Sequence, residues 1–209
     1  MDPIKLNNSS ILKAKSIKEG WLDSETNEVM FFKNDNYVIG YKVKSKTNDN
    51  YTISHKVDFS FNGNESVLFD NKKGARVYKG TSIEDARTWM GFAKNDFVAE
   101  VKIRDSEKVN FITLSMLENL DMKAIFPKRI EIYGKSNDRW LPINQLEIDL
   151  QDSPDDRKSY FKEFTLAVNL EGYNEVKIVA VNHFKFPKAP VYDRKRKYSW
   201  IFIDEVIFW

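Results

Sequence analysis

Short segments rich in β-branched and aromatic residues recur along the whole chain, and polar turns separate them. Each is bounded by Asn, Asp, Gly or Pro, which favour turns and interrupt strands. Helical periodicity is hard to find, and only residues 82–90 could form a turn or two of helix. Many short strands without intervening helices predict an all-β sandwich or barrel. The predicted strands are residues 29–32, 37–43, 98–103, 111–117, 129–134, 161–168, 175–181 and 200–208.

The last of these segments is unusual because it closes the chain and is almost entirely apolar. In SWIFIDEVIFW, residues 199–209, only one serine and the adjacent carboxylates Asp204 and Glu205 are polar. Chain ends are normally frayed and hydrophilic. Because this segment does not alternate, both of its faces should be covered, as in an interior strand of a sheet. RIEIYG, by contrast, alternates, with Ile130 and Ile132 on one face, as a half-exposed strand does.

Composition limits what this sheet protein can be. With 209 residues, 42% of them hydrophobic, the chain can bury a core, and its net charge of +2 argues against a dedicated nucleic-acid binder. The absence of cysteine excludes disulfide scaffolding, thiolate zinc sites and a cysteine nucleophile. No apolar run reaches the ~18 residues needed to cross a bilayer, so no membrane insertion is expected. The first residues lack a signal-peptide core, which indicates either a cytoplasmic protein or a piece of a longer exported one.

The chain divides at a polar loop. KNDN, residues 33–36, follows the first predicted strand, and the composition shifts there. We therefore predict a small β element over residues 1–34 and the main domain over residues 35–209. No internal repeat or low-complexity segment stands out.

Catalytic signatures are absent from the sequence. It contains no Gly-x-Ser-x-Gly, no His-Glu-x-x-His and no phosphate-binding Gly-x-x-x-x-Gly-Lys-Ser/Thr. Only His55 and His183 could act as imidazole bases or metal ligands, and nothing in the sequence places two carboxylates together in a cleft. We expect that this chain alone is not an enzyme.

Six segments occur in an order that is typical of one family. They are SVLFDNKKG (66–74), TWMGFAKNDFVAEVKI (88–103), VNFITLSMLEN (109–119), IFPKRIEIYGKSNDRW (125–140), YNEVKIVAVN (173–182) and WIFIDEVIF (200–208). From about residue 35 this set resembles the discoidin-like (coagulation factor type C, galactose-binding-like) module, most closely the version at the C-termini of bacterial β-hexosaminidases and related exported enzymes. The resemblance implies a galactose-binding-like jelly-roll β-sandwich. Residues 1–34 resemble the terminal strands of a small fibronectin-type-III-like (chitobiase C-terminal-like) domain.

The resemblance implies a function as well as a fold. It indicates a non-catalytic carbohydrate-binding module that targets a larger exported multidomain enzyme to glycans. The expected partners are a glycan and the other domains of that parent enzyme, and the expected location is periplasmic, cell-surface or secreted. The alternative is a structural or protein-interaction domain that keeps the fold but has lost sugar binding.

A structural calcium ion is also implied by the resemblance. Its ligands would be backbone carbonyls together with Asp70 and Glu205, and Ca²⁺ is readily held by loop carbonyls and one or two carboxylates. Asn71 replaces the glycine that the family places after the aspartate, but asparagine tolerates positive φ. The alternative is that Asp204 and Glu205 pair with basic side chains or accept backbone hydrogen bonds.

Aromatic residues in predicted loops and strand ends are the candidates for stacking on a sugar ring. For Trp89, which lies with Phe92 in a Trp-x-Gly-Phe motif, packing in the core is the favoured interpretation. For His183 and Tyr192, in the long loop at 182–199, packing and ligand binding both remain open. The aromatic and imidazole candidates are Trp89, Phe126, His183 and Tyr192.

The same loop carries a basic run. Arg194 and Arg196 lie in VYDRKRKYS, where hexosaminidase-type modules have Trp-His-Pro-Gly-x-Gly. Arginine recognises sulfate or carboxylate groups with two parallel hydrogen bonds, so the run could contact an anionic polysaccharide. The alternative is a solvated charge run with no ligand.

Overall fold

The computed structural model describes residues 4–7, 9–31, 37–45, 68–69, 78–79, 82–83, 89–119, 123–149, 159–184 and 198–209. Over these ranges the regular structure is strand, apart from one short 3-10 helix, η3 (Ser106–Lys108). None of the described segments forms a helix with the length and apolarity to cross a membrane. The strands are β1 (Ser10–Ala14), β2 (Asn27–Phe31), β3 (Val38–Val43), β4 (Tyr78–Lys79), β5 (Ser82–Ile83), β6 (Met90–Ala93), β7 (Phe97–Ile103), β8 (Phe111–Asn119), β9 (Arg129–Ser136), β10 (Arg139–Glu147), β11 (Ser159–Ala167), β12 (Glu175–Val181) and β13 (Trp200–Phe208).

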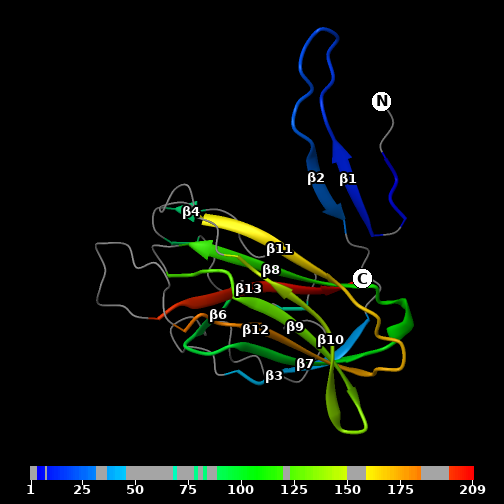
Figure 1. Cartoon of the computed structure of the whole chain (residues 1–209), viewed down its shortest axis with the longest axis vertical. Coiled ribbons are helices and arrows are strands. Elements are labelled where there is room, and N and C mark those ends of the chain that lie inside the picture. Colours follow the sequence, from blue (N-terminus) through cyan, green and yellow to red (C-terminus); the bar gives the residue numbers. More distant parts are fainter. Residues whose placement is uncertain are drawn as a thin grey trace.

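Two antiparallel sheets form a sandwich. One has the order β10-β9-β12-β7-β3 and the other the order β11-β8-β13-β6 (Figure 1). The main core lies between them, where Ile132 and Ile178 of the first sheet and Ile112 and Ile203 of the second are fully buried. Alternation on β9 is as predicted, because Ile130 and Ile132 are buried while their neighbours are partly exposed. The predicted all-β sandwich is therefore confirmed.

The C-terminal segment is an interior strand, as its lack of alternation predicted. β13 pairs with β8 on one side and β6 on the other. Ile201 and Ile203 face the main core, whereas Phe202 lies in a second cluster with Trp89, Leu117 and Ala124. Each face of β13 thus has its own apolar environment, so neither face needs polar residues.

The predicted strands are found with small shifts, and β1, β4, β5, β6 and β10 are additional. β10 contains Pro142. Proline has no backbone N–H to donate to a neighbouring strand, so it is normally expected to interrupt a strand. In the structure β10 is an edge strand, and its register with β9 shifts between Pro142 and Asn144. Proline is tolerated at edges and bulges, and the sequence does not show which strand lies at an edge.

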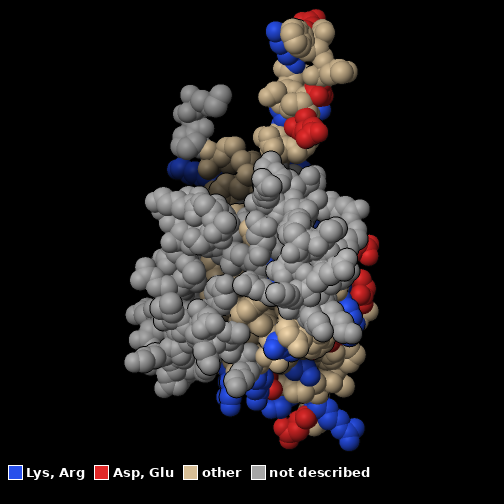
Figure 2. All heavy atoms as spheres, turned by 90° about the vertical axis from the view of Figure 1, so that its left-hand side faces the viewer, with Lys and Arg blue, Asp and Glu red and all other residues tan. Residues whose placement is uncertain are grey.

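The N-terminal residues form a separate two-stranded hairpin. β1 and β2 pair only with each other and project from the sandwich (Figures 1 and 2). Lys15 and Asp23 form an ion pair at 2.6 Å, and the turn beyond them exposes Trp21 (70%) and Leu22 (99%). The hairpin falls within the predicted element at 1–34, and β3 is the first strand of the sandwich. The assignment of residues 1–34 to a fibronectin-type-III-like domain remains a prediction.

Candidate binding site at one end of the sandwich

A buried asparagine connects three segments at the end of β12. The side-chain amide of Asn182 donates to the carbonyls of Asn95 (3.0 Å), Phe92 (3.3 Å) and Ser199 (3.4 Å). Its Oδ1 accepts from Ser199 Oγ (2.6 Å) and from the backbone N–H of Phe184 (3.0 Å). Asn182 is completely buried. One side chain therefore fixes the β6–β7 turn, the exit from β12 and the entry to β13.

Two residues held by this asparagine have left-handed backbone conformations. The φ angles of Lys94 and Phe184 are 61° and 57°. Such angles are uncommon for residues other than glycine, and sparsely populated conformations of this kind cost on the order of 1–3 kcal/mol each. Asn182 bonds to Asn95, directly after Lys94, and to Phe184 itself, so it opposes relaxation of both. Strain of this kind concentrates at functional sites.

Two aromatic rings are exposed beside the asparagine. Phe184 is 45% exposed and Tyr198 is 46% exposed. The amine of Lys94 lies 3.9 Å from the centroid of the Tyr198 ring. Aromatic rings can stack on the apolar face of a sugar, while nearby amines and hydroxyls form hydrogen bonds to its hydroxyl groups. The arrangement is chemically suited to a shallow sugar site.

His183 adds a partly buried imidazole to this end of the sandwich. Its Nε2 is buried and has no hydrogen-bond partner among the residues that the structure describes. Burial lowers the pKa of His183 below the ordinary value, and the charge of Lys128 lowers it further. A neutral imidazole can donate one hydrogen bond and accept another, which suits recognition of a hydroxyl group.

The other predicted residues of the long loop are Tyr192, Arg194 and Arg196, and they lie outside the described residues. The described residues that flank them in the sequence, Phe184 and Tyr198, both lie at this site. Their roles in ligand binding remain predictions.

Two further sequence candidates pack against the interior. Trp89 is fully buried in the second cluster and lies 5.8 Å, between ring centroids, from Phe161. Its burial favours the packing interpretation and leaves it out of the site proposed below. Phe126 is partly buried and packs edge-on against Phe164 at 5.1 Å.

The acidic pair of the last strand is buried. Asp204 is fully buried, Glu205 is 1% exposed, and the pairing of β13 with β8 shifts register at this point. The next residue, Val206, donates its N–H to the carbonyl of Leu68 at 2.7 Å. Asp70 lies outside the described residues. Its pairing with Glu205 at a calcium site remains a prediction, and within the described part of the chain no group of three or more His, Asp or Glu could hold a metal ion.

The sequence did not indicate the roles of Asn182, Phe184, Tyr198 or Lys94. Asn182, Phe184 and Tyr198 lie in the loop at 182–199, but the sequence indicates only the position of that loop and not the role of any of the three residues. The bonds of Asn182 reach residues up to 90 positions away, and such contacts exist only in the folded chain.

Neither a protein-family model nor a curated protein sequence matches this chain. Among solved structures, it resembles the CBM32-1, CBM32-2 and M60 catalytic domains of Clostridium perfringens ZmpB, with a TM-score of 0.39, 12% identity and 83% of this chain covered. This chain spans 14% of that protein's length. It also resembles CBM32-3 from a Clostridium perfringens family 31 glycoside hydrolase, with a TM-score of 0.34, 12% identity, and 66% of this chain and 86% of that chain covered.

A third similar structure is the K2 cleaved adhesin domain of Lys-gingipain. Its TM-score is 0.33 at 9% identity, with 58% of this chain and 70% of that chain covered. At these scores the likeness says nothing of what this chain binds, and the fold assignment depends on the two sheets themselves.

Proposed function

We propose that this chain is a non-catalytic carbohydrate-binding module that holds a larger exported enzyme on a glycan. The observation that carries the proposal is the pair of exposed rings, Phe184 and Tyr198, next to a buried asparagine with Lys94 and His183 beside them. Asn182 holds the backbone that carries Phe184 before binding, so less conformational freedom is lost there on contact with a sugar. A shallow site gives weak binding. Attachment to an enzyme would compensate for this, because the linked module and enzyme raise each other's local concentration on the glycan.

The test is a titration of the whole chain with neutral galactose- and N-acetylhexosamine-containing oligosaccharides, followed by amide NMR shifts and calorimetry. Shifts are expected at Lys94, His183 and Phe184. Tyr198→Ala should weaken binding about tenfold, since loss of one stacked ring costs on the order of 1 kcal/mol or more. Phe31→Ala, which removes an aromatic ring of similar exposure on the projecting hairpin, is the control and should leave binding unchanged. Absence of binding to any neutral glycan, with and without Ca²⁺, would count against the proposal.

We further propose a structural calcium site that uses Asp70 and Glu205. Three observations support it: the Glu205 carboxylate is buried, Leu68 is hydrogen-bonded to the residue after Glu205, and Asp70 follows Leu68 by two positions. A buried carboxylate needs a compensating charge or hydrogen bonds. A bound Ca²⁺ ion would neutralise Glu205 and join the end of the chain to the segment around residue 70.

The hairpin supports the alternative function, a protein-interaction domain. An isolated two-stranded hairpin is marginally stable in water, and this one exposes Ile17, Trp21 and Leu22 at its turn. Exposed apolar groups of this kind mark interaction surfaces. The test is cross-linking of the chain to the other domains of the parent enzyme, compared with a Trp21→Ser/Leu22→Ser double variant. Loss of cross-linking in the double variant, together with no glycan binding by either the unmodified chain or the variant, would favour this function over the first.

A further inference from the structure

The outer face of the five-stranded sheet presents an ordered array of rings and charges. The pairing registers align residues across the strands in rows. One row is Trp140, Lys135, Glu175, Lys102 and Gly40, and the next is Pro142, Tyr133, Lys177, Glu100 and Lys42. The two rows together contain four lysines and two glutamates, so this part of the face is positively charged.

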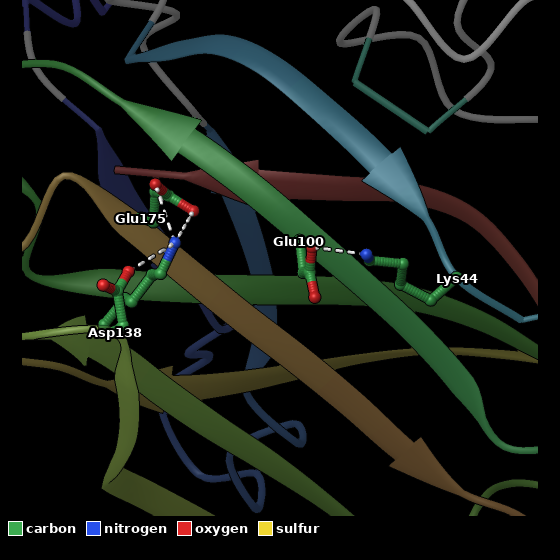
Figure 3. A network of polar contacts seen from close by, with 5 residues as sticks. Lys44, Glu100, Asp138 and Glu175 are labelled. Atoms are coloured by element: carbon green, nitrogen blue, oxygen red, sulfur yellow. Dashed lines mark hydrogen bonds and ion pairs between the residues drawn. The ribbon is translucent and has the colours of Figure 1, made fainter.

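The carboxylates of these rows already have cationic partners. Glu175 pairs with Lys135 at 3.1 Å, and Glu100 pairs with Lys44 at 2.9 Å. Figure 3 shows Lys44 directed at Glu100, and it shows Glu175 and Asp138 together in another part of the same sheet face. Each of these glutamates therefore already has a lysine as its direct ion-pair partner.

Lys177 lies in the middle of the array. Among the described residues it has no carboxylate within ion-pair distance. Its amine lies 4.3 Å from the centroid of the Tyr133 ring and 5.1 Å from that of Trp140. Cations contact aromatic faces in this way, but a ring quadrupole does not neutralise a full charge. Glu131 also attracts Lys177 electrostatically, but its two oxygens are hydrogen-bonded to Arg129 and Tyr133. Lys177 therefore has no direct ion pair among the described residues and can accept an anionic partner.

Both rings beside Lys177 belong to the β9–β10 hairpin, and a hydrogen bond also holds the Tyr133 ring. The hydroxyl of Tyr133 donates to Glu131 Oε2 at 2.6 Å, and Arg129 holds the other oxygen of Glu131. Trp140 follows the β9–β10 turn, in which Asn137 and Asp138 have φ angles of 47° and 60°. Both rings thus project from a paired hairpin rather than from a loose loop.

We propose that this face binds an acidic sugar unit, with its carboxylate or sulfate group on Lys177 and its ring against Trp140. The proposal rests on the carbohydrate-binding function proposed above and adds a second site for a different class of glycan. Charge complementarity selects the occupant, because the unneutralised groups of both rows are cations. Lys177 lies on β12, and Asn182 follows the end of that strand, five residues later. At about 3.3 Å per residue the two are about 16 Å apart along the strand direction, so the two sites are separate.

The test uses the full chain with two probes, an oligogalacturonate and a neutral galactose oligosaccharide of equal length. The acidic probe should shift the indole N–H of Trp140 and the amide of Lys177, and its affinity should fall as salt rises. Lys177→Met and Trp140→Ala should each weaken binding of the acidic probe about tenfold, since the first removes a bond to a charged group and the second removes a stacked ring. Lys42→Met is the matched control, because it removes the same charge from the same face away from the rings, and should change affinity less than twofold.

The two proposals fail separately. If the neutral probe binds at Phe184 and Tyr198 but the acidic probe fails to shift Trp140, the second site is overturned and the first stands. If the acidic probe binds on the sheet face and the neutral probe does not bind, the first site falls instead. Equal weakening by Lys42→Met and Lys177→Met would also overturn the second site, because it would show only non-specific attraction. Melting curves of each variant verify that it remains folded.

Discussion

At the scale of single residues, Asn182 has the most consequence for this molecule. Three backbone carbonyls, one hydroxyl and one backbone N–H bond to its side chain, and the bonds to Phe92 and Ser199 are buried. Backbone groups left without a partner in the interior are costly, so the geometry of the candidate site and the stability of the sandwich share one side chain.

Asn182→Ala should therefore lower the free energy of unfolding by about 2–4 kcal/mol, since several buried polar groups lose their partner at once. It should also weaken binding of neutral glycans by releasing Phe184. Asn169→Ala is the control, because Asn169 is exposed and its side chain accepts one hydrogen bond, 3.2 Å long, from the backbone N–H of Glu171. A loss in Asn182→Ala no larger than in the control, measured by urea denaturation, would contradict the role given to Asn182.

His183 should make stability depend on pH. Burial, followed by the charge of Lys128, lowers the pKa of His183, so the unfolded chain binds a proton at a higher pH than the folded chain does. The folded state is favoured fully above about pH 6.5, the ordinary value, and loses stability as the pH falls from there towards the folded pKa. His183→Gln should remove this component of the pH dependence of unfolding. A folded pKa equal to the ordinary value, measured by NMR titration, would remove this pH dependence, and a higher one would reverse its sign.

At the scale of elements, close contact between strands explains one motif. Gly91 of the Trp-x-Gly-Phe sequence lies on β6 opposite Phe202 of β13, and a Cβ atom at this position would come 2.9 Å from the Phe202 ring. Phe202 is buried in the second cluster with Trp89, so the ring has little room to move. The glycine is required by packing between two paired strands.

Gly91→Ala should lower the free energy of unfolding by about 1–3 kcal/mol, the usual cost of an extra methyl group in a packed interior. Gly40→Ala on β3 is the matched control. The nearest atom to its added Cβ, the Cβ of Lys102, is 4.0 Å away, so this variant should be neutral within a few tenths of a kcal/mol or slightly stabilising. Equal melting temperatures for the two variants would refute the packing explanation.

At the scale of the whole molecule, the end of the chain lies in the interior. β13 is central in its sheet, lines both apolar clusters and brings Asp204 and Glu205 out of contact with solvent. The backbone of Leu68 bonds to β13 directly after these carboxylates. Stability should therefore depend on what neutralises this acidic pair.

With the proposed calcium site, excess EDTA should lower the melting temperature, because an ion that binds only the folded form stabilises it by mass action. At a Ca²⁺ concentration 100 times the dissociation constant the loss would be about 2.7 kcal/mol. Re-addition of Ca²⁺ should restore the melt, whereas an equal concentration of Mg²⁺ should not, because Mg²⁺ demands smaller octahedral sites. A melt unchanged by EDTA would remove the calcium proposal and leave pairing with protein groups as the explanation.

The sequence by itself determined the class of fold and the place of its last strand. Segments such as RIEIYG and WIFIDEVIF show their burial in their periodicity, because alternate residues of a strand face opposite sides of a sheet. Periodicity is a local property, so it is visible without coordinates. Only the tertiary structure decided that Pro142 lies in an edge strand, that Asn182 joins three segments, and that Lys177 lies between Tyr133 and Trp140. Each of these depends on contacts between residues distant in the chain, which strand pairing and packing create and which no local pattern contains.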